Sequence, residues 1–178
     1  MTKIFDLDIN EIWIDEDMSK EERENFFRIL NSEMEKVYRF TLTFYEYLYE
    51  KRDYGNGEPL SMLEIHILTD VNDNPGMTVT ELAKKWKRTT SAVSQIIKSF
   101  YDGGLIDRVR NKDDGKVNNL YITDEGKKLV DIHKHYDNID TIKTLKTLRK
   151  EATTDEIEAF FKVAEIYGDI MEGREKGE

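Results

Sequence analysis

Along residues 19–52, apolar or small residues recur in alternating steps of three and four. This spacing predicts a long helix that packs one face along another helix. Ser19 and Glu22 fit a capping box, which places the start of the helix, and the run from Gly55 to Pro59 stops it. At 1.5 Å per residue the helix is roughly 50 Å long, so we expect its apolar face to require a partner. The stripe consists of Phe27, Leu30, Met34, Val37, Thr41, Phe44 and Leu48.

Two more capping boxes follow, from Ser61 to Glu64 and from Thr78 to Glu81. In each box a hydroxyl and a carboxylate three residues apart satisfy the first backbone N–H groups of a helix. Thr89 is a further N-cap candidate, and Gly103-Gly104 ends its helix, because glycine accepts the left-handed conformation of a C-terminal cap. These signals predict helices over residues 62–71, 79–86 and 90–101, with a turn at Lys87-Arg88.

Residues 105–112 and 117–122 are predicted as two strands of a hairpin. Asp113-Asp114-Gly115 predicts a tight turn between them, because Asp-Gly suits the positive φ angles of such turns. The order helix, short helix, turn, helix, hairpin is that of a winged helix-turn-helix. We therefore expect the hairpin to form the wing of such a lobe.

Two more helices are predicted after residue 123, the first capped by Thr123 and the second beginning near Thr153 or Thr154. Their apolar stripes are Leu129, Ile132, Tyr136 and Ile139, and Ile157, Phe160, Ala164, Tyr167 and Met171. The fold class is mostly α with a small β-hairpin wing. We divide the chain into an acidic extension (1–18), a winged helix-turn-helix lobe (60–123) and a dimerisation region (19–59 and 124–178). The predicted dimerisation residues are Phe27, Leu30, Met34, Val37, Phe44, Ile157, Phe160, Ala164 and Tyr167.

The net charge of −10 is unevenly distributed over the 178 residues. Residues 77–123 carry 9 basic and 5 acidic side chains, whereas residues 1–76 carry 8 and 18, so only the middle segment has the sign that meets phosphates. The chain has no cysteine, which excludes disulfides and thiol-based redox sensing. The chain has no run of about 18 apolar residues, so no membrane span is predicted. Without a signal-peptide pattern at the N-terminus, the expected location is cytoplasmic.

The predicted helix 90–101 carries the most informative pattern. Ser91, Ser94, Gln95 and Lys98 share one face, opposite the apolar residues, and these four positions include no acid. Hydroxyls and an amide on a helix in the major groove can reach base edges. A basic wing tip can lie along the minor groove. An ordinary solvated face and a hairpin charged for solubility are the alternatives. The predicted DNA-binding residues are Arg88, Thr89, Thr90, Ser91, Ser94, Gln95, Lys98, Arg108, Arg110, Lys112 and Lys116.

Residues 60 to about 129 resemble the DNA-binding lobe of the MarR family of transcriptional regulators. The similar pieces are Thr80-Glu81-Leu82-Ala83, Ser91-Ala92-Val93-Ser94-Gln95, Gly104-Leu105-Ile106-Asp107-Arg108, the Asp114/Lys116 wing tip and Ile122-Thr123-Asp124-Glu125-Gly126. The resemblance implies a homodimer that binds a palindromic site in double-stranded DNA and responds to a small molecule or metal. The chain departs from the family in having Lys116 where arginine is usual and Gln95 where a basic residue is common, so weaker minor-groove insertion and a preference for adenine are expected.

Other classes of function have less support. The chain lacks a glycine-rich phosphate loop, a nucleophile elbow and a convergent histidine–carboxylate pattern, so no enzyme is predicted. No metal site or cofactor is predicted, because His133 and His135 point to different sides of a helix and His66 is isolated. Aromatic residues of the first long helix leave open a binding site for a small aromatic or lipophilic effector. The alternative function is a winged-helix module that binds protein without binding DNA.

Overall fold

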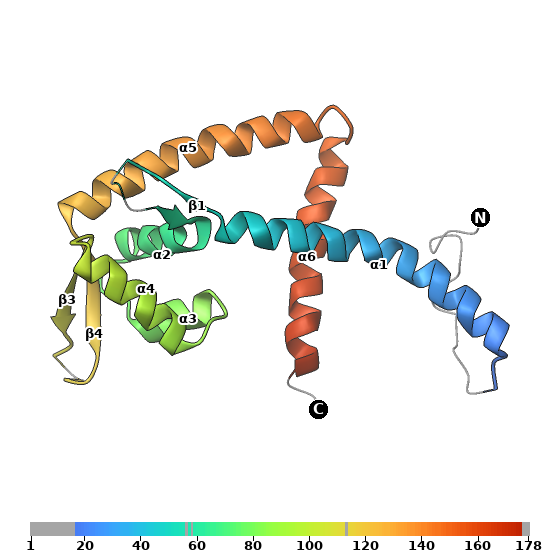
Figure 1. The fold of residues 1–178 in the computed structure, drawn as a ribbon, viewed down its shortest axis with the longest axis horizontal. Helices are drawn as coiled ribbons and strands as arrows, with labels where there is room; N and C mark the ends of the chain where they lie inside the picture. The colour runs from blue at the N-terminus through green and yellow to red at the C-terminus, as the bar shows by residue number, and fades with distance from the viewer. Residues whose placement is uncertain (1–16, 56, 58, 113, 176–178) are drawn as a thin grey trace. The chain divides into compact units, whose positions relative to one another are not determined.

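The computed structural model describes residues 17–175 except Asn56, Glu58 and Asp113, with the backbone alone for Arg174 and Glu175. Most of the expected acidic extension, residues 1–16, is outside the described residues. The chain divides into two compact units, Met1–Ile67 and Leu68–Glu178. Figure 1 shows the elements of both units along the chain.

The first unit is dominated by one long helix, α1 (Lys20–Tyr49). The capping box is confirmed: the Glu22 N–H donates to the Ser19 hydroxyl at 3.3 Å, and the Ser19 N–H donates to the Glu22 carboxylate at 3.0 Å. The hydrogen bonds from the Ser19 hydroxyl and backbone lower the pKa of Glu22. No residue of α1 is buried. The apolar stripe of α1 is therefore not covered by other parts of the described chain.

α1 ends three residues earlier than its pattern predicts. Lys51–Arg52 forms a short strand, β1, that pairs antiparallel with β2 (Leu60–Ser61). The backbone groups that would have extended the helix are used in this pairing. The predicted stop at Gly55 to Pro59 therefore does not end the helix; Gly55 and Gly57, with φ angles of 96° and 77° in the left-handed region, lie in the loop between β1 and β2 instead.

The helix after β2, α2 (Met62–Asp73), begins with the predicted box between Ser61 and Glu64. It continues two residues beyond the predicted end at Val71. The buried apolar side chains of the first unit are Tyr54, Leu60, Met62, Leu63, Ile65 and Ile67. Most of them lie in β2 and the first turns of α2.

The second unit contains the helix-turn-helix and the hairpin. α3 (Val79–Lys85) and α4 (Thr90–Asp102) are followed by β3 (Ile106–Arg110) and β4 (Asn118–Ile122), as predicted (Figure 1). Fully buried apolar side chains from all of these elements form one core. Its main members are Leu82, Val93, Ile97, Phe100, Ile106, Leu120 and Val130. This core fixes α4 against the wing.

The wing is also attached to the segment that precedes α3. The Gly76 N–H donates to the Leu120 carbonyl at 2.8 Å, and the Leu120 N–H donates to the Met77 carbonyl at 2.9 Å. The Asn119 amide adds a bond to the Gly76 carbonyl. Gly76 has a φ of 91°, which a glycine adopts without strain. β4 is therefore hydrogen-bonded on both edges, and the wing is tied to the start of the helix-turn-helix.

The tight wing turn predicted at Asp113-Asp114-Gly115 is wrong. The strands end at Arg110 and Asn118, so the connection is longer, and Gly115 does not have a positive φ. A backbone bond closes a turn over residues 114–117, where the Val117 N–H donates to the Asp114 carbonyl at 3.0 Å, and the Asp114 carboxylate also accepts the backbone N–H of Lys116 at 2.9 Å. The side-chain bond therefore adds to the backbone bond of this turn.

α5 (Asp124–Leu148) and α6 (Thr154–Glu175) complete the second unit. Thr123 caps α5, accepting the Gly126 N–H at 3.1 Å, and the predicted start of α6 is confirmed by reciprocal bonds between Thr153 and Glu156. Gly126 is buried at the start of α5, where a Cβ would stand 2.2 Å from the Leu105 carbonyl oxygen.

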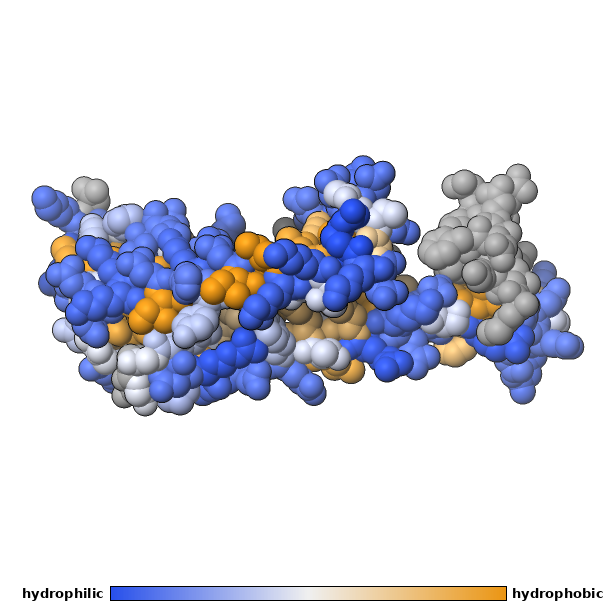
Figure 2. Space-filling view, turned by 90° about the horizontal axis from the view of Figure 1, so that it is seen from above, coloured by the Kyte–Doolittle hydropathy of each residue, from blue (hydrophilic) through white to orange (hydrophobic). Residues whose placement is uncertain are grey.

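Only the first part of α5 belongs to the lobe core, through Leu129, Val130 and His133. Beyond it, large apolar side chains of α5 and α6 are exposed, and Figure 2 shows orange apolar surface among hydrophilic residues. These side chains are Ile132, Tyr136, Ile139, Ile142, Leu145, Leu148, Phe160, Phe161, Val163, Ile166, Ile170 and Met171. Within the described residues, no helix is both long enough and apolar enough to cross a membrane.

Candidate nucleic-acid interface

The turn between α3 and α4 is held by a carboxylate from α2. Asp70 accepts the Trp86 indole N–H at 2.8 Å and pairs with Lys85, and its own side chain is 13% exposed. Lys87 takes the left-handed position of the turn with a φ of 50°, and the Arg88 N–H bonds the Ala83 carbonyl at 2.9 Å. These contacts set the direction in which α4 leaves the turn.

α4 presents two different faces. Val93, Ile97 and Phe100 are buried in the core. The four residues of the predicted readout face are exposed, and the Thr89 hydroxyl caps the helix by accepting the Ala92 N–H at 3.2 Å. The predicted division of α4 into a core face and an open face is therefore confirmed. Contact between the open face and DNA bases stays a prediction.

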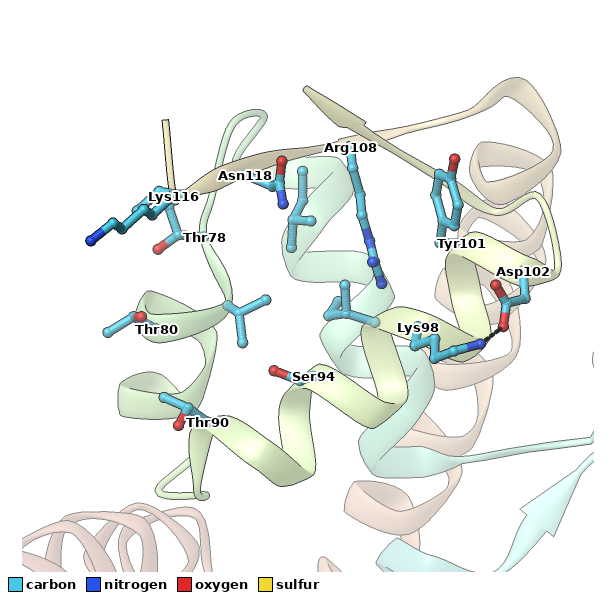
Figure 3. A pocket seen from close by; sticks show the side chains of 14 residues that line it. Thr78, Thr80, Thr90, Ser94, Lys98, Tyr101, Asp102, Arg108, Lys116 and Asn118 are labelled. Atoms are coloured by element: carbon cyan, nitrogen blue, oxygen red, sulfur yellow. Dashed lines mark hydrogen bonds and ion pairs between the residues drawn. The ribbon is translucent and has the colours of Figure 1, made fainter. Parts of the chain in front are cut away.

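A hollow of about 710 Å³ lies between α4, the start of α3 and the wing. Figure 3 shows its lining side chains, which come from all three elements. Hydroxyls, an amide and three cations predominate among the polar groups. Its polar lining consists of Thr78, Thr80, Thr90, Ser94, Lys98, Tyr101, Asp102, Arg108, Lys116 and Asn118. Such a surface offers donors to an anionic, hydrogen-bonding ligand.

Two of the three cations are held by neighbours on the last turn of α4. The Arg108 guanidinium lies 4.8 Å from the centre of the Tyr101 ring, within the range of a cation–π contact. Lys98 forms an ion pair with Asp102 one turn further along the helix (Figure 3). The open face of α4 is thus free of acid at the four predicted positions but ends in a carboxylate that pairs with one of them.

The register of the wing explains how Arg108 enters the hollow. Arg108 pairs with Leu120 and Arg110 pairs with Asn118, and residues two apart on a strand point to the same face. Since Leu120 is buried in the core, this is the face that the wing turns towards the lobe. Arg108 therefore reaches from β3 towards α4 (Figure 3).

The structure brings some of the predicted DNA-binding residues together and leaves others outside the hollow. Those that line it are Thr90, Ser94, Lys98, Arg108 and Lys116. Those that are exposed but do not line it are Arg88, Thr89, Ser91, Gln95, Arg110 and Lys112. Sequence reasoning missed Thr78, Thr80, Tyr101, Asp102 and Asn118. Only Asp102 carried a usable signal, because an acid four residues after Lys98 predicts a helical ion pair.

A helix-turn-helix whose second helix is followed by a hairpin defines a winged-helix protein. Residues 60–117 match the sequence model described as the MarR family. This match covers α2, α3, α4 and β3, so the winged-helix lobe is similar to this family.

Other proteins share this likeness. The uncharacterized HTH-type transcriptional regulator YhjH of Bacillus subtilis (strain 168) is 36% identical over 84 residues. That match covers 47% of this chain and 48% of YhjH, so the chain spans about half the length of this relative.

Two solved structures share the fold. FabT of Streptococcus pneumoniae, solved in complex with DNA, has a TM-score of 0.57 at 20% identity and covers 83% of this chain and 98% of its own. ZitR of Lactococcus lactis, described as a zinc-responsive MarR family member, has a TM-score of 0.59 at 19% identity, with 80% and 99% covered. At these identities the likeness concerns the fold.

Proposed function

We propose that this protein binds a palindromic operator in double-stranded DNA as a homodimer, and thereby regulates transcription. The observation that carries the proposal is the hollow between α4 and the wing, whose polar lining holds three cations and one acid that is already paired. DNA presents phosphate oxygens to cations and hydroxyls, and base edges to amides and hydroxyls in the major groove. FabT, with a similar fold, was solved bound to DNA. The location that goes with this proposal is the cytoplasm.

In the proposal, α4 reads bases while the wing contacts the backbone. Ser91, Ser94 and Gln95 are short or neutral and exposed on α4, and an amide such as that of Gln95 can bond two edge atoms of adenine. Lys112 and Lys116 are exposed near the wing tip. As point charges they would contribute affinity without much preference for sequence.

The proposed homodimer rests on the apolar surface of α1, α5 and α6. Isolated helices with such surfaces bury them against other helices. Phe27, Val37, Phe44 and Phe160 are 40% or more exposed, Ala164 is also exposed, and the other predicted dimerisation residues, Leu30, Met34, Ile157 and Tyr167, are half-buried. A second copy would offer the same surfaces in a two-fold arrangement, which matches a palindromic operator.

We propose that a small aromatic or lipophilic effector controls DNA binding. The support is the aromatic group on α1, where the Phe40 and Phe44 rings stack 5.7 Å apart and the Phe44 and Tyr47 rings 6.0 Å apart. Aromatic surfaces of this kind line many sites for apolar ligands. The test is a shift in DNA affinity, with a panel of aromatic carboxylates and fatty acids as probes.

Replacing Lys116 with alanine is expected to reduce the salt dependence of DNA binding. One lost phosphate contact lowers the slope of log Kobs against log salt concentration by about one unit. The measurement is a mobility-shift titration of a selected operator at four salt concentrations. Lys146→Ala removes the same charge from α5, outside the lobe, and should leave the slope unchanged. Equal slopes for both variants would contradict a DNA contact at the wing tip.

Replacing Gln95 with alanine is expected to relax the preference at one base pair in each half-site by about 1–3 kcal/mol. The reason is that the amide is the group on this face able to bond adenine at two atoms. The measurement is competition between the operator and its single-base variants. Lys112→Ala should weaken all of these sequences alike. If Gln95→Ala keeps the full preference at every position, α4 presents a different face to the bases.

A further inference from the structure

Residues on the last turn of α4 contact two of the three cations that line the hollow. Tyr101 supports Arg108 through its ring, and its neighbour Asp102 pairs with Lys98. Figure 3 shows Lys98 directed along the helix towards Asp102. Among the described residues that line the hollow, Asp102 is the one acid. This carboxylate therefore stands at a surface otherwise suited to anions.

The ion pair is exposed, because the side chains of Lys98 and Asp102 are 70% and 54% accessible to solvent. Pairs of this kind, spaced i to i+4 on a helix surface, contribute little to stability. Asp102 therefore contributes little to the stability of the fold. Because the ion pair is weak, a phosphate oxygen can displace the carboxylate from Lys98 at a small cost in free energy.

We propose that Asp102 is an internal competitor for DNA phosphate, which lowers the affinity for all DNA sequences by a similar factor. The inference rests on the proposed DNA-binding function. In the free protein the carboxylate of Asp102 neutralises Lys98. In the complex it stands beside the phosphate that has taken its place, and the two anions repel each other. Phosphates are the same at every step of DNA, so the effect does not depend on sequence.

The competition also reduces the salt dependence of binding. A lysine that is already paired within the protein releases fewer counterions when it meets a phosphate, and each phosphate contact contributes about 0.9 to the slope. Without Asp102, Lys98 would add a full contact. Asp102 would thus lower the affinity for the operator and for non-specific DNA alike, and the bases contacted by α4 would still set the ratio of the two affinities.

The test compares Asp102→Asn with Asp107→Asn in the full-length protein. Both variants remove one charge from an exposed position, but Asp107 lies on β3 and does not line the hollow. Asp102→Asn is expected to bind the operator and an unrelated duplex about 3- to 10-fold more tightly at 50 mM salt. Its advantage should shrink about 3.5-fold on going to 200 mM salt, from one added contact. Asp107→Asn should change both affinities less than twofold.

A double variant separates the proposed competition from a general charge effect. In a Lys98→Ala background, Asp102→Asn should gain no more than Asp107→Asn does. The inference is overturned if the two single variants behave alike, or if Asp102→Asn loses affinity for one sequence only, as expected for a carboxylate that accepts a hydrogen bond from cytosine. If the parent protein binds no DNA, the proposed function itself fails, which is a different outcome.

Discussion

Replacing Phe44 with glutamate is expected to convert the protein into a monomer and to reduce operator affinity by about 100-fold or more. Phe44 is 48% exposed and stacks on Phe40 and Tyr47 near the C-terminal end of α1. A carboxylate there would have to be buried without a partner in the proposed dimer. A monomer holds one half-site, so it loses the gain that comes from linking two binding events. Light scattering and a mobility shift measure the two effects.

Ser32→Glu is the matched control for this variant. Ser32 is exposed on α1, about 170° around the helix from the mean direction of the predicted stripe at 100° per residue, and it therefore faces away from the proposed interface. The added charge is the same, and both mass and operator affinity should stay at the parent values. A dimer of unchanged affinity in the Phe44→Glu variant would contradict the proposed role of α1.

Replacing Gly126 with alanine is expected to destabilise the winged-helix lobe by about 3 kcal/mol. A Cβ at this position would stand 2.2 Å from the Leu105 carbonyl oxygen and 2.7 Å from Cδ1 of Ile122. The carbonyl cannot move aside, because it accepts the Thr123 N–H at 3.1 Å, in the connection that carries the wing into α5. Urea denaturation at fixed protein concentration measures the loss as a lower midpoint.

Gly173→Ala tests whether the effect of Gly126→Ala comes from crowding. Gly173 lies in α6, is exposed, and has no atom within 4 Å of the position that a Cβ would take. Alanine favours a helix over glycine, so the midpoint should stay the same or rise. If Gly126→Ala and Gly173→Ala had the same urea midpoint, the close approach of position 126 to the Leu105 carbonyl would be contradicted.

The sequence was most informative where structure is determined by neighbours along the chain. Ser19–Glu22, Ser61–Glu64 and Thr78–Glu81 each predicted a helix start, and all three form the reciprocal hydrogen bonds. The bonds from the Thr78 backbone and hydroxyl also lower the pKa of Glu81. Such boxes can be predicted because both partners lie within one helical turn.

Features that depend on distant partners could not be predicted in the same way. β1 pairs with β2 across a loop, and nothing in the two residues Lys51 and Arg52 indicates a strand. The attachment of Leu120 to Gly76 and Met77 joins segments more than 40 residues apart. The Arg108–Tyr101 contact likewise depends on how β3 packs against α4. These distant contacts determine the geometry of the site, whereas the local sequence patterns predict only its helices and strands.

The wing turn shows a different limit. Asp-Gly is a good signal for a tight hairpin, but the strands end before they reach it. Asp114 is used instead to hold the backbone of Lys116. The same residues thus have a structural role that their pattern did not specify, and this role positions the lysine on which the salt prediction depends.

The most direct test of the account is the retention of genomic DNA fragments by the purified full-length protein over a series of salt concentrations. We predict that a few fragments are retained at low salt, that each contains a palindromic pair of half-sites, and that affinity falls steeply as salt increases, because phosphate contacts release counterions. A folded dimer that retains no fragment at 50 mM salt would contradict the central claim that α4 and the wing form a DNA-binding surface.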